Sequence, residues 1–302
     1  MMLGALLGDL GALPQVQLLT TRDARLPPLA APVEVVVTGE AVDIWSCWED
    51  CLRQADAVWP IAPESGGVLE RLSRLAVQHG KVLFGSSPTA VALAASKYAT
   101  SAALAAQQVA MVPTFRPAEI SRNLCGPWVA KPDDGAGCED TCYFEQTSEL
   151  MPWLLQGQRM QTHVVQPYLQ GEAASLSMLC HAGEARLLAC NRQLIALQQG
   201  RFSYHGSELN GMVQHWSLFE RLAREVASAL PGLSGYVGVD LVLRDGEATV
   251  IEVNPRLTTS YVGLGQAMGG NPARLVLDLI YNDGFQSFPD IARNVVKVSI
   301  DA

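Results

Sequence analysis

Short apolar runs alternate with longer segments of mixed polarity over the first third of the chain. The runs at residues 33–37, 57–61 and 82–84 are rich in β-branched and aromatic residues, which is typical of strands. The segments between them, residues 41–54 and 64–79, have the length and composition of helices. Because strands that alternate with helices form βαβ units, we predict a parallel sheet in one small α/β domain. Its limits are set at residues 1–96.

An alanine-rich segment opens the next part of the chain. Residues 87–108 favour a helix that contains Lys97, because alanine has the highest helix propensity. Two expected strands and one expected helix follow, at residues 112–115, 128–132 and 148–156. We interpret residues 97–166 as a small lid.

The apolar runs become longer beyond residue 162. Helical stretches lie at residues 216–230 and 272–281, and the strands around them include a hairpin at residues 238–254. This pattern predicts a larger α+β unit over residues 167–302. The fold class is therefore α/β, with an α+β arrangement in the C-terminal part.

Composition and charge exclude several classes of protein. Hydrophobic residues make up 49% of the 302 residues and charged residues 17%, which suits a globular enzyme. No apolar run approaches the roughly 20 residues that span a bilayer, and the apolar first ten residues predict an amphipathic helix and not a signal peptide. The formal charge of −9 disfavours nucleic acid, because such binding depends on an excess of Lys and Arg. Seven scattered cysteines favour a reducing cytoplasm.

The expected hairpin carries oxygen-bearing side chains on one face. Glu252 and Asn254 are two residues apart on a strand, so their side chains point the same way. Asp240 lies on the partner strand, and the turn at residues 244–246 joins the two. Carboxylate and amide oxygens are the ligands that Mg²⁺ prefers, so this pattern predicts a metal site. Taken alone, it also fits a surface hairpin with solvated side chains.

A glycine-containing loop follows another expected strand. Lys131 ends this strand, and Gly135, Ala136 and Gly137 come directly after it. Glycines let backbone N–H groups approach phosphate oxygens closely, so the loop is a candidate nucleotide contact. Its spacing differs from that of a P-loop, and an ordinary hairpin turn is the alternative interpretation.

These motifs, together with Lys97, Gln166-Pro-Tyr168-Leu169 and Arg256, occur in an order that resembles the ATP-grasp superfamily of carboxylate–amine ligases. The resemblance covers roughly residues 30–285. It implies an ATP-grasp fold, with an N-terminal Rossmann-like α/β domain, a small lid and a larger base domain. Such ligases usually open with a strand, whereas this chain opens with its expected helix, so either the start is trimmed or the parallel sheet is one strand short.

The same resemblance implies how ATP is held. Lys97 and Lys131 are the paired lysines that contact the phosphates. The alternative for Lys97 is a solvated position on a surface helix. The adenine and ribose contacts are expected from the connector after the lid, namely Gln166, Tyr168, Leu169 and Glu172.

Metal binding and catalysis follow from the resemblance in the same way. Asp240, Glu252 and Asn254 are expected to hold Mg²⁺ or Mn²⁺ against the phosphates. Arg256 is expected to meet the transferring phosphoryl group or the tetrahedral intermediate. Arg192, at the end of an apolar strand, is a second candidate for pairing with a phosphate or a substrate carboxylate.

The activity implied is amide formation in the cytoplasm from ATP, a small-molecule carboxylate such as glutamate and a small-molecule amine. The layout and the segment at residues 191–193 most resemble the tyramine–glutamate ligases of methanofuran-type cofactor biosynthesis. Two alternatives stay open: another amino-acid or polyglutamate ligase, and a non-catalytic ATP-binding module. Neither a nucleic acid nor a membrane is expected as a partner, and a homodimer is left open.

Overall fold

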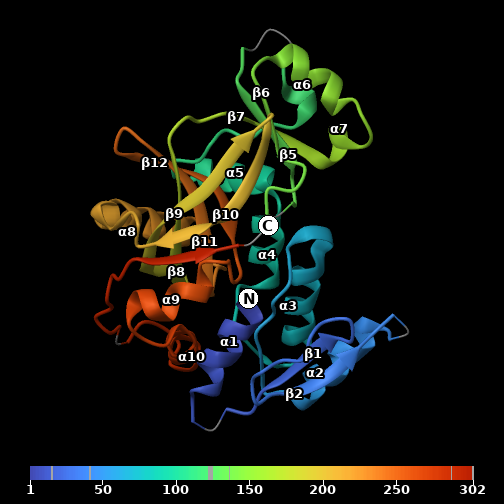
Figure 1. Ribbon diagram of the computed structural model, residues 1–302, viewed down its shortest axis with the longest axis vertical. Coiled ribbons are helices and arrows are strands. Elements are labelled where there is room, and N and C mark those ends of the chain that lie inside the picture. The colour runs from blue at the N-terminus through green and yellow to red at the C-terminus, as the bar shows by residue number, and fades with distance from the viewer. Residues whose placement is uncertain (15, 41, 122–124, 136, 287, 301–302) are drawn as a thin grey trace.

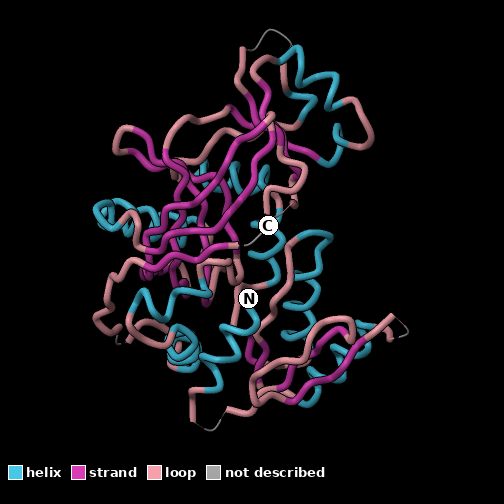
Figure 2. The backbone as a smooth tube through the Cα atoms, viewed as in Figure 1, coloured by secondary structure: helices cyan, strands magenta, loops and turns pink. Residues whose placement is uncertain are grey.

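One antiparallel sheet runs through the upper half of the molecule in Figure 1, and a smaller parallel unit lies below it. The computed structural model describes residues 1–14, 16–40, 42–121, 125–135, 137–286 and 288–300. Figure 2 shows the strands of the large sheet gathered in the centre, with helices on its outer side and beneath it. Within the described residues, no helix combines the length and the apolar character needed to cross a membrane.

The parallel unit contains two strand pairs and two longer helices. Its elements are β1 (Leu19–Asp23), β2 (Glu34–Thr38), α2 (Ile44–Gln54), β3 (Ala57–Val58), the 3-10 helix η1 (Ser65–Gly67), α3 (Val68–Gln78) and β4 (Val82–Leu83). β1 pairs with β2 and β3 pairs with β4, both in parallel, so the predicted parallel direction is confirmed. The strand β1 was not predicted, and the strands form two separate pairs and not the single sheet expected. β3 is shorter than expected because Pro60 has no N–H to offer a neighbouring strand.

The first helix packs outside this parallel unit. α1 (Met2–Gly11) lies against α9 (Tyr261–Met268) and α10 (Pro272–Tyr281) near the opposite end of the chain (Figure 1). Leu6 is buried in the core that these helices share, and Asn271 Nδ2 donates to the carbonyl of Asp9 at 2.8 Å. The expected helix is present, and its apolar face packs against α9 and α10.

The alanine-rich segment forms two helices and not the single one expected. α4 (Pro88–Ala95) ends where Ser96 takes an extended conformation, and α5 (Lys97–Ala106) begins at the next residue. Ser96 Oγ accepts the N–H of Ala99 at 3.1 Å, so it caps the second helix. Alanine propensity was therefore overridden by a local side-chain cap. The break moves Lys97 from the middle of an exposed helix to a buried helix start.

The lid and base share one sheet. Its path runs β12-β11-β8-β9-β10-β6-β5-β7, and β13 adds to β10. The lid strands are β5 (Trp128–Pro132), β6 (Cys142–Phe144) and β7 (His163–Pro167), with α6 (Thr147–Leu154), α7 (Arg159–Thr162) and the 3-10 helix η2 (Pro117–Glu119) beside them. The base strands are β8 (Glu172–His181), β9 (Glu184–Gln198), β10 (Arg201–Leu209), β11 (Gly235–Arg244), β12 (Glu247–Asn254) and β13 (Val296–Ser299). Lid and base strands meet at one residue pair, Arg201 with Cys142.

The core of the base lies between the sheet and α8 (Trp216–Ala229), which follows the 3-10 helix η3 (Val213–His215). Phe219, Leu222, Ala223 and Val226 recur at helical spacing and are all buried against sheet residues. This packing fixes the strands that carry the site.

The prediction of a strand at residues 112–115 is wrong. Met111 and Phe115 form only isolated bridges, with Val250 and Val165. Pro113 has no N–H and interrupts the backbone ladder between them. The segment instead crosses between the base and the lid.

Replacing the cap between α4 and α5 tests the helix break. Ser96→Ala should lower the free energy of unfolding by about 1 kcal/mol, the usual contribution of a helix N-cap. Urea denaturation monitored by circular dichroism measures this loss. Ser148→Ala is the matched control, because the Ser148 hydroxyl meets the Gln146 side chain and not a backbone N–H. Equal stability of both variants would contradict the assignment.

Candidate active site

Two neighbouring strands bring the predicted metal ligands together. β11 and β12 are joined by Asp245 and Gly246, both with left-handed φ of 52° and 81°, as a two-residue hairpin turn requires. In this register Asp240 lies opposite Glu252, and Asn254 follows two residues later on the same face. Opposite residues in an antiparallel pair share one face of the sheet, so the three side chains converge.

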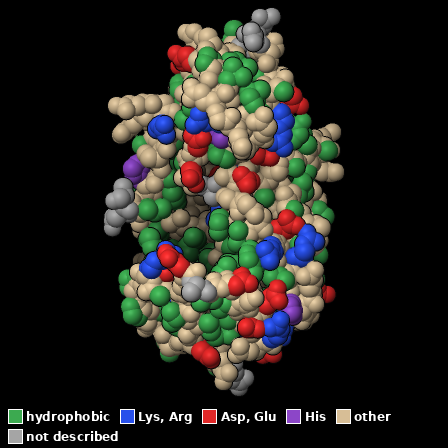
Figure 3. All heavy atoms as spheres, turned by 90° about the vertical axis from the view of Figure 1, so that its right-hand side faces the viewer, with side chains coloured by type: hydrophobic (Ala, Val, Ile, Leu, Met, Phe, Trp, Pro, Cys, Tyr) green, Lys and Arg blue, Asp and Glu red, His purple; other side chains and the backbone are tan. Residues whose placement is uncertain are grey.

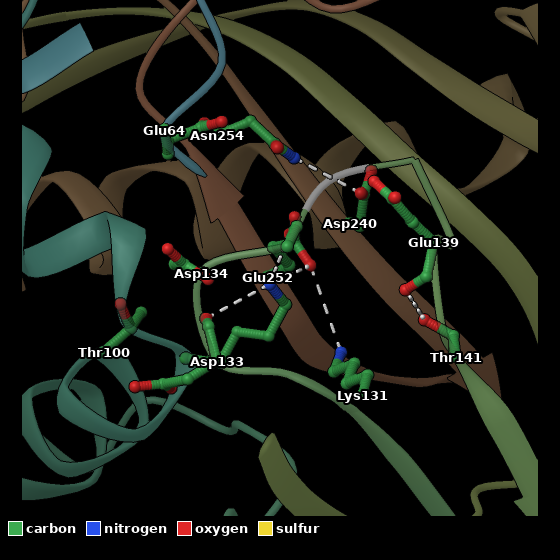
Figure 4. Close-up of polar contacts among 12 residues, drawn as sticks. Glu64, Thr100, Lys131, Asp133, Asp134, Glu139, Thr141, Asp240, Glu252 and Asn254 are labelled. Atoms are coloured by element: carbon green, nitrogen blue, oxygen red, sulfur yellow. Dashed lines mark hydrogen bonds and ion pairs between the residues drawn. The ribbon is translucent and has the colours of Figure 1, made fainter. Parts of the chain in front are cut away.

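Asp240 is held on both of its carboxylate oxygens. Gln193 Nε2 donates to Oδ1 at 2.7 Å. Asn254 Nδ2 donates to Oδ2 at 3.2 Å, as Figure 4 shows. Burial raises the pKa of Asp240, and the neighbouring charge of Glu252 raises it further. The two carboxylates therefore repel each other in a site from which water is largely removed.

The two predicted lysines meet at Glu252. Lys97 and Lys131 are 4% and 7% exposed, and their ammonium groups lie 3.4 and 4.0 Å from Glu252 Oε2. Figure 4 shows the contact of Lys131. Burial lowers the pKa of Lys131 to about 8, against the opposing effect of Glu252. The structure thus excludes a solvated surface role for Lys97.

The glycine loop lies over Lys97. The Lys97 ammonium donates to the carbonyl oxygens of Gly135 at 2.6 Å and Asp133 at 3.3 Å. Gly137 has a left-handed φ of 69°, which favours glycine. Ala136, the remaining residue predicted in this loop, lies outside the described residues.

Asp133 ties the start of this loop to α5. Its carboxylate accepts the Ser96 hydroxyl at 2.8 Å and the backbone N–H of Tyr98 at 2.9 Å, and Arg116 pairs with it at 2.9 Å. The break before α5 and the position of the loop are therefore parts of one arrangement.

The connector after the lid forms a second wall. Gln166 is buried and donates through Nε2 to Thr114 Oγ1 at 2.9 Å, which leaves its Oε1 as an acceptor for a bound molecule. The ring of Tyr168 packs against Tyr143 with centroids 5.0 Å apart. An acceptor beside aromatic rings suits an adenine with its exocyclic amino group.

Arg192 and Glu172 are paired with each other. Arg192 Nη2 lies 3.2 Å from Glu172 Oε2, and Nη1 lies 3.2 Å from Glu208 Oε2. Arg192 is thus bound to the residue predicted to hold ribose, on the nucleotide side of the site. Its predicted contact with a phosphate or a substrate carboxylate stays a prediction.

Arg256 lies directly beyond the metal ligands. Its Nη2 is 3.5 Å from Asn254 Oδ1, and its Nη1 donates to the carbonyl of Leu257 at 3.0 Å. Its Nε donates to Glu64 Oε2 at 2.7 Å, across the boundary with the parallel unit. The Arg256 guanidinium is therefore fixed beside Asn254, one of the three predicted metal ligands.

The two lysines, the Asp240–Glu252–Asn254 set, Arg192 and Arg256 all line one cavity of about 560 Å³. Figure 3 shows this side of the molecule hollowed at mid-height, with acidic and basic side chains on the rim. Every predicted site residue in the described part of the chain lines this cavity. Further lining residues that the sequence did not single out include Ile195, Leu197, Phe202 and Tyr204, whereas Thr258, Thr259 and Ser260 belong to the polar loop after the hairpin, which was expected to touch the acceptor.

The donor set fits a hard divalent cation. Asp240 and Glu252 supply carboxylate oxygens and Asn254 an amide oxygen, and a cation between the carboxylates would relieve the repulsion that raises the pKa of Asp240. Among the described residues there is no cluster of three or more His, Cys, Asp or Glu side chains suited to a metal. The set has only two carboxylates, which leaves room for phosphate oxygens to complete the coordination.

Three side chains that shape the site were not predicted: Gln193, Asp133 and Glu64. Gln193 was weighed only as part of the segment with Arg192, although alternation along β9 could have pointed it toward the hairpin. Asp133 lies in the glycine loop, but only the glycines and the alanine of that loop were considered. Glu64 contacts a residue 192 positions away, and no local signal in the sequence could have revealed that contact.

Comparison with known proteins agrees with this geometry. Residues 94–260, more than half of the chain, match the ATP-grasp domain family, and residues 16–91 match the pre ATP-grasp 3 domain. The chain belongs to the ATP-grasp family. ATP-grasp enzymes use ATP with divalent metal ions.

Two relatives carry the same name. The tyramine–L-glutamate ligase of Methanocaldococcus fervens is 29% identical over 237 residues, which cover 77% of this ATP-grasp chain and 70% of the relative. The tyramine–L-glutamate ligase of Methanocaldococcus jannaschii is 27% identical over 208 residues, with 68% of this chain and 56% of the relative covered. The chain therefore spans little more than half of the second relative.

A solved structure shows the same fold. The L-amino acid ligase from Bacillus licheniformis superposes with a TM-score of 0.71 at 17% identity, over 91% of this chain and 70% of that one. Family and relatives together identify an ATP-dependent ligase that forms carbon–nitrogen bonds and releases ADP.

Neutralising the carboxylate that both lysines contact tests the metal site. Glu252→Gln should lower turnover by about 10–100-fold, the usual scale for losing one well-placed charge contact, and should raise the metal concentration needed for half-maximal rate. Steady-state ADP release over a Mg²⁺ titration measures both quantities. Glu247→Gln, at the exposed start of the same strand, is the control. An unchanged rate and metal dependence for Glu252→Gln would refute its role as a ligand.

Proposed function

We propose that this ligase activates the carboxylate of an amino acid such as glutamate with ATP and Mg²⁺, and joins it to a small amine. The observation that carries the proposal is a single cavity that holds two buried lysines, a carboxylate pair and Arg256. The two relatives named tyramine–L-glutamate ligase support glutamate and an aromatic amine as the substrates, in methanofuran-type cofactor biosynthesis.

The reaction consists of two displacements. A carboxylate oxygen attacks the γ-phosphorus of ATP, and the bond from this phosphorus to the β–γ bridging oxygen breaks. The products of this step are an acyl phosphate and ADP. The amine nitrogen then attacks the acyl carbon, the carbon–oxygen bond to phosphate breaks, and the nitrogen gives up a proton to water or phosphate. No side-chain nucleophile is needed, so catalysis depends on positioning and charge.

The negative charge on the phosphates of ATP would be neutralised by side chains that already line the cavity. The Lys97 ammonium lies under the glycine loop, where phosphate oxygens would replace its contacts with the carbonyls of Gly135 and Asp133. The Lys131 ammonium faces the same carboxylate, Glu252. Asp240, Glu252 and Asn254 would hold Mg²⁺, which withdraws electron density from the phosphoryl oxygens when it is bound. The lid residues exclude water that would hydrolyse an acyl phosphate.

The polar loop after β12 supports the placement of the amino acid. Thr258, Thr259 and Ser260 line the cavity beyond Arg256, and Thr258 Oγ1 lies 2.8 Å from the hydroxyl of Tyr236. Gly238 has no side chain, and a Cβ there would lie 2.5 Å from Thr258 Cγ2. Glycine at this position therefore lets the loop approach the metal hairpin.

The test is product analysis by mass spectrometry after incubation with ATP, Mg²⁺, glutamate and a panel of amines. We expect ADP and a glutamyl amide in equal amounts, with tyramine among the accepted amines. A product with glutamate as the acceptor would identify a polyglutamate ligase instead. If MgATP does not bind in calorimetry, the chain is a non-catalytic module and the proposal is wrong.

Arg256 should act on the reaction more than on the resting complex. Arg256→Lys keeps the charge and loses the planar fork, so kcat and kcat/KM should fall together, by about 10–100-fold, while the Kd for ATP stays nearly constant. Steady-state kinetics and calorimetry on the same preparation measure these quantities. Loss of ATP binding with kcat preserved would make Arg256 an anchor for the ground-state phosphate.

A further inference from the structure

Glu64 is a buried carboxylate whose partner comes from another part of the chain. Its side chain is 7% exposed and its Oε2 lies 2.7 Å from Nε of Arg256, whose side chain is 15% exposed. Its second oxygen, Oε1, is buried and has no hydrogen-bond partner among the described residues. The pair with Arg256 is therefore the interaction that compensates the charge of Glu64 in this part of the molecule.

The contact fixes which N–H groups of Arg256 are left for a substrate. A guanidinium has five donors, one on Nε and two on each terminal nitrogen. Glu64 takes the Nε donor, and Leu257 and Asn254 each take one donor from a terminal nitrogen. One N–H remains on each of Nη1 and Nη2. Two free terminal N–H groups can donate to two oxygens of a phosphoryl group or a carboxylate.

The backbone holds Glu64 in place. Pro63 O accepts the N–H of Leu69 at 3.3 Å and Glu64 O accepts the N–H of Gly67 at 3.0 Å, so the turn closes on itself before α3. Gly66 and Gly67 both have left-handed φ, 63° and 69°, which other residues adopt only at a cost. The sequence Pro-Glu-Ser-Gly-Gly thus builds a rigid support for the carboxylate.

The same turn also contacts the glycine loop. Ser65 Oγ donates to the carbonyl of Asp134 at 3.0 Å, and the Gly66 N–H donates to Asp134 Oδ2 at 3.1 Å. One short turn of the parallel unit therefore touches both Arg256 and the loop above the lysines. Figure 4 shows Glu64 beside Asn254 and Asp134 on the same side of the site.

We propose that Glu64 is a positioning residue for the ligase reaction, which holds the Arg256 fork toward the transferring phosphoryl group. The inference rests on the proposed function, because it assigns a role within that reaction. Glu64 does not line the cavity, so it acts through Arg256 and touches no substrate. The parallel unit in this way completes the active site of the lid and base.

The first test measures the chemical step without an amine. Hydroxylamine traps an acyl phosphate as a hydroxamate, so glutamate, MgATP and hydroxylamine report acyl phosphate formation alone. Glu64→Gln keeps the shape and removes the charge, and should lower kcat for hydroxamate about 10–100-fold, with the Kd for ATP changed less than about twofold. Glu70→Gln is the matched control, since Glu70 pairs with Arg74 on the exposed side of α3.

A double-mutant cycle separates positioning from general stability. If Glu64 acts through Arg256, the double variant Glu64→Gln with Arg256→Lys should be no slower than the slower single variant. If the fold-decreases in kcat of the two single variants multiply in the double variant, the proposal is overturned. A wild-type kcat in a folded Glu64→Gln protein would overturn it as well. Thermal unfolding of each variant confirms that the fold is retained.

A spectroscopic measurement tests the positioning role without any substrate. The Arg256 Nε–H resonance, assigned by its loss in Arg256→Lys, should be shifted and slow to exchange in the wild type. It should move and exchange faster in Glu64→Gln and stay unchanged in Glu70→Gln. An unaltered resonance in Glu64→Gln refutes the positioning role. Absence of hydroxamate from wild-type protein, with this resonance behaving as expected, refutes the proposed function alone.

Discussion

The organisation of the site follows from four charges that lie together, two buried lysines and two partly buried carboxylates. Two lysines face two carboxylates, and Glu252 lies within ion-pair distance of both ammonium groups. A buried charge is costly unless it is paired, so each of these side chains depends on the others being in place. The helix break at Ser96, the tight hairpin turn and the loop carbonyls over Lys97 all serve this requirement. ATP and a metal would replace these contacts with equivalent ones.

Beneath the charges lies a network of buried hydroxyl and amide groups. Ser177 Oγ lies 3.0 Å from the hydroxyl of Tyr236, and Asn191 Nδ2 donates to Ser175 and Ser177, each at 3.3 Å. Asn191, Ser175, Asp240 and Glu252 occupy one row across four strands. Such a layer restricts the rotamers of the groups next to it, and therefore helps to position Asp240 and Glu252.

Local chemistry explains how much of this arrangement could be predicted from the sequence. The hairpin with Asp240, Glu252 and Asn254 followed from alternation and a turn signal, and the parallel unit followed from its alternating strands and helices. The break before Lys97 did not, because alanine content predicts a helix while a single serine side chain ends one. Gln193 and Glu64 act across 47 and 192 residues, and such contacts exist only after the chain has folded. Sequence patterns therefore predicted the side chains that line the cavity and missed several side chains that hold them in place.

The junction between lid and base has a mechanical consequence. β10 and β6 pair at a single position, with one further hydrogen bond from Tyr143 N to Gly200 O at 2.8 Å, whereas β8 and β11 pair at nine positions. Swinging the lid outward would break few backbone hydrogen bonds, while separating the base strands would break many. The sheet is thus compliant at one seam and stiff elsewhere. Thermal motion should concentrate at that seam and leave the coordinating groups of the base undisturbed.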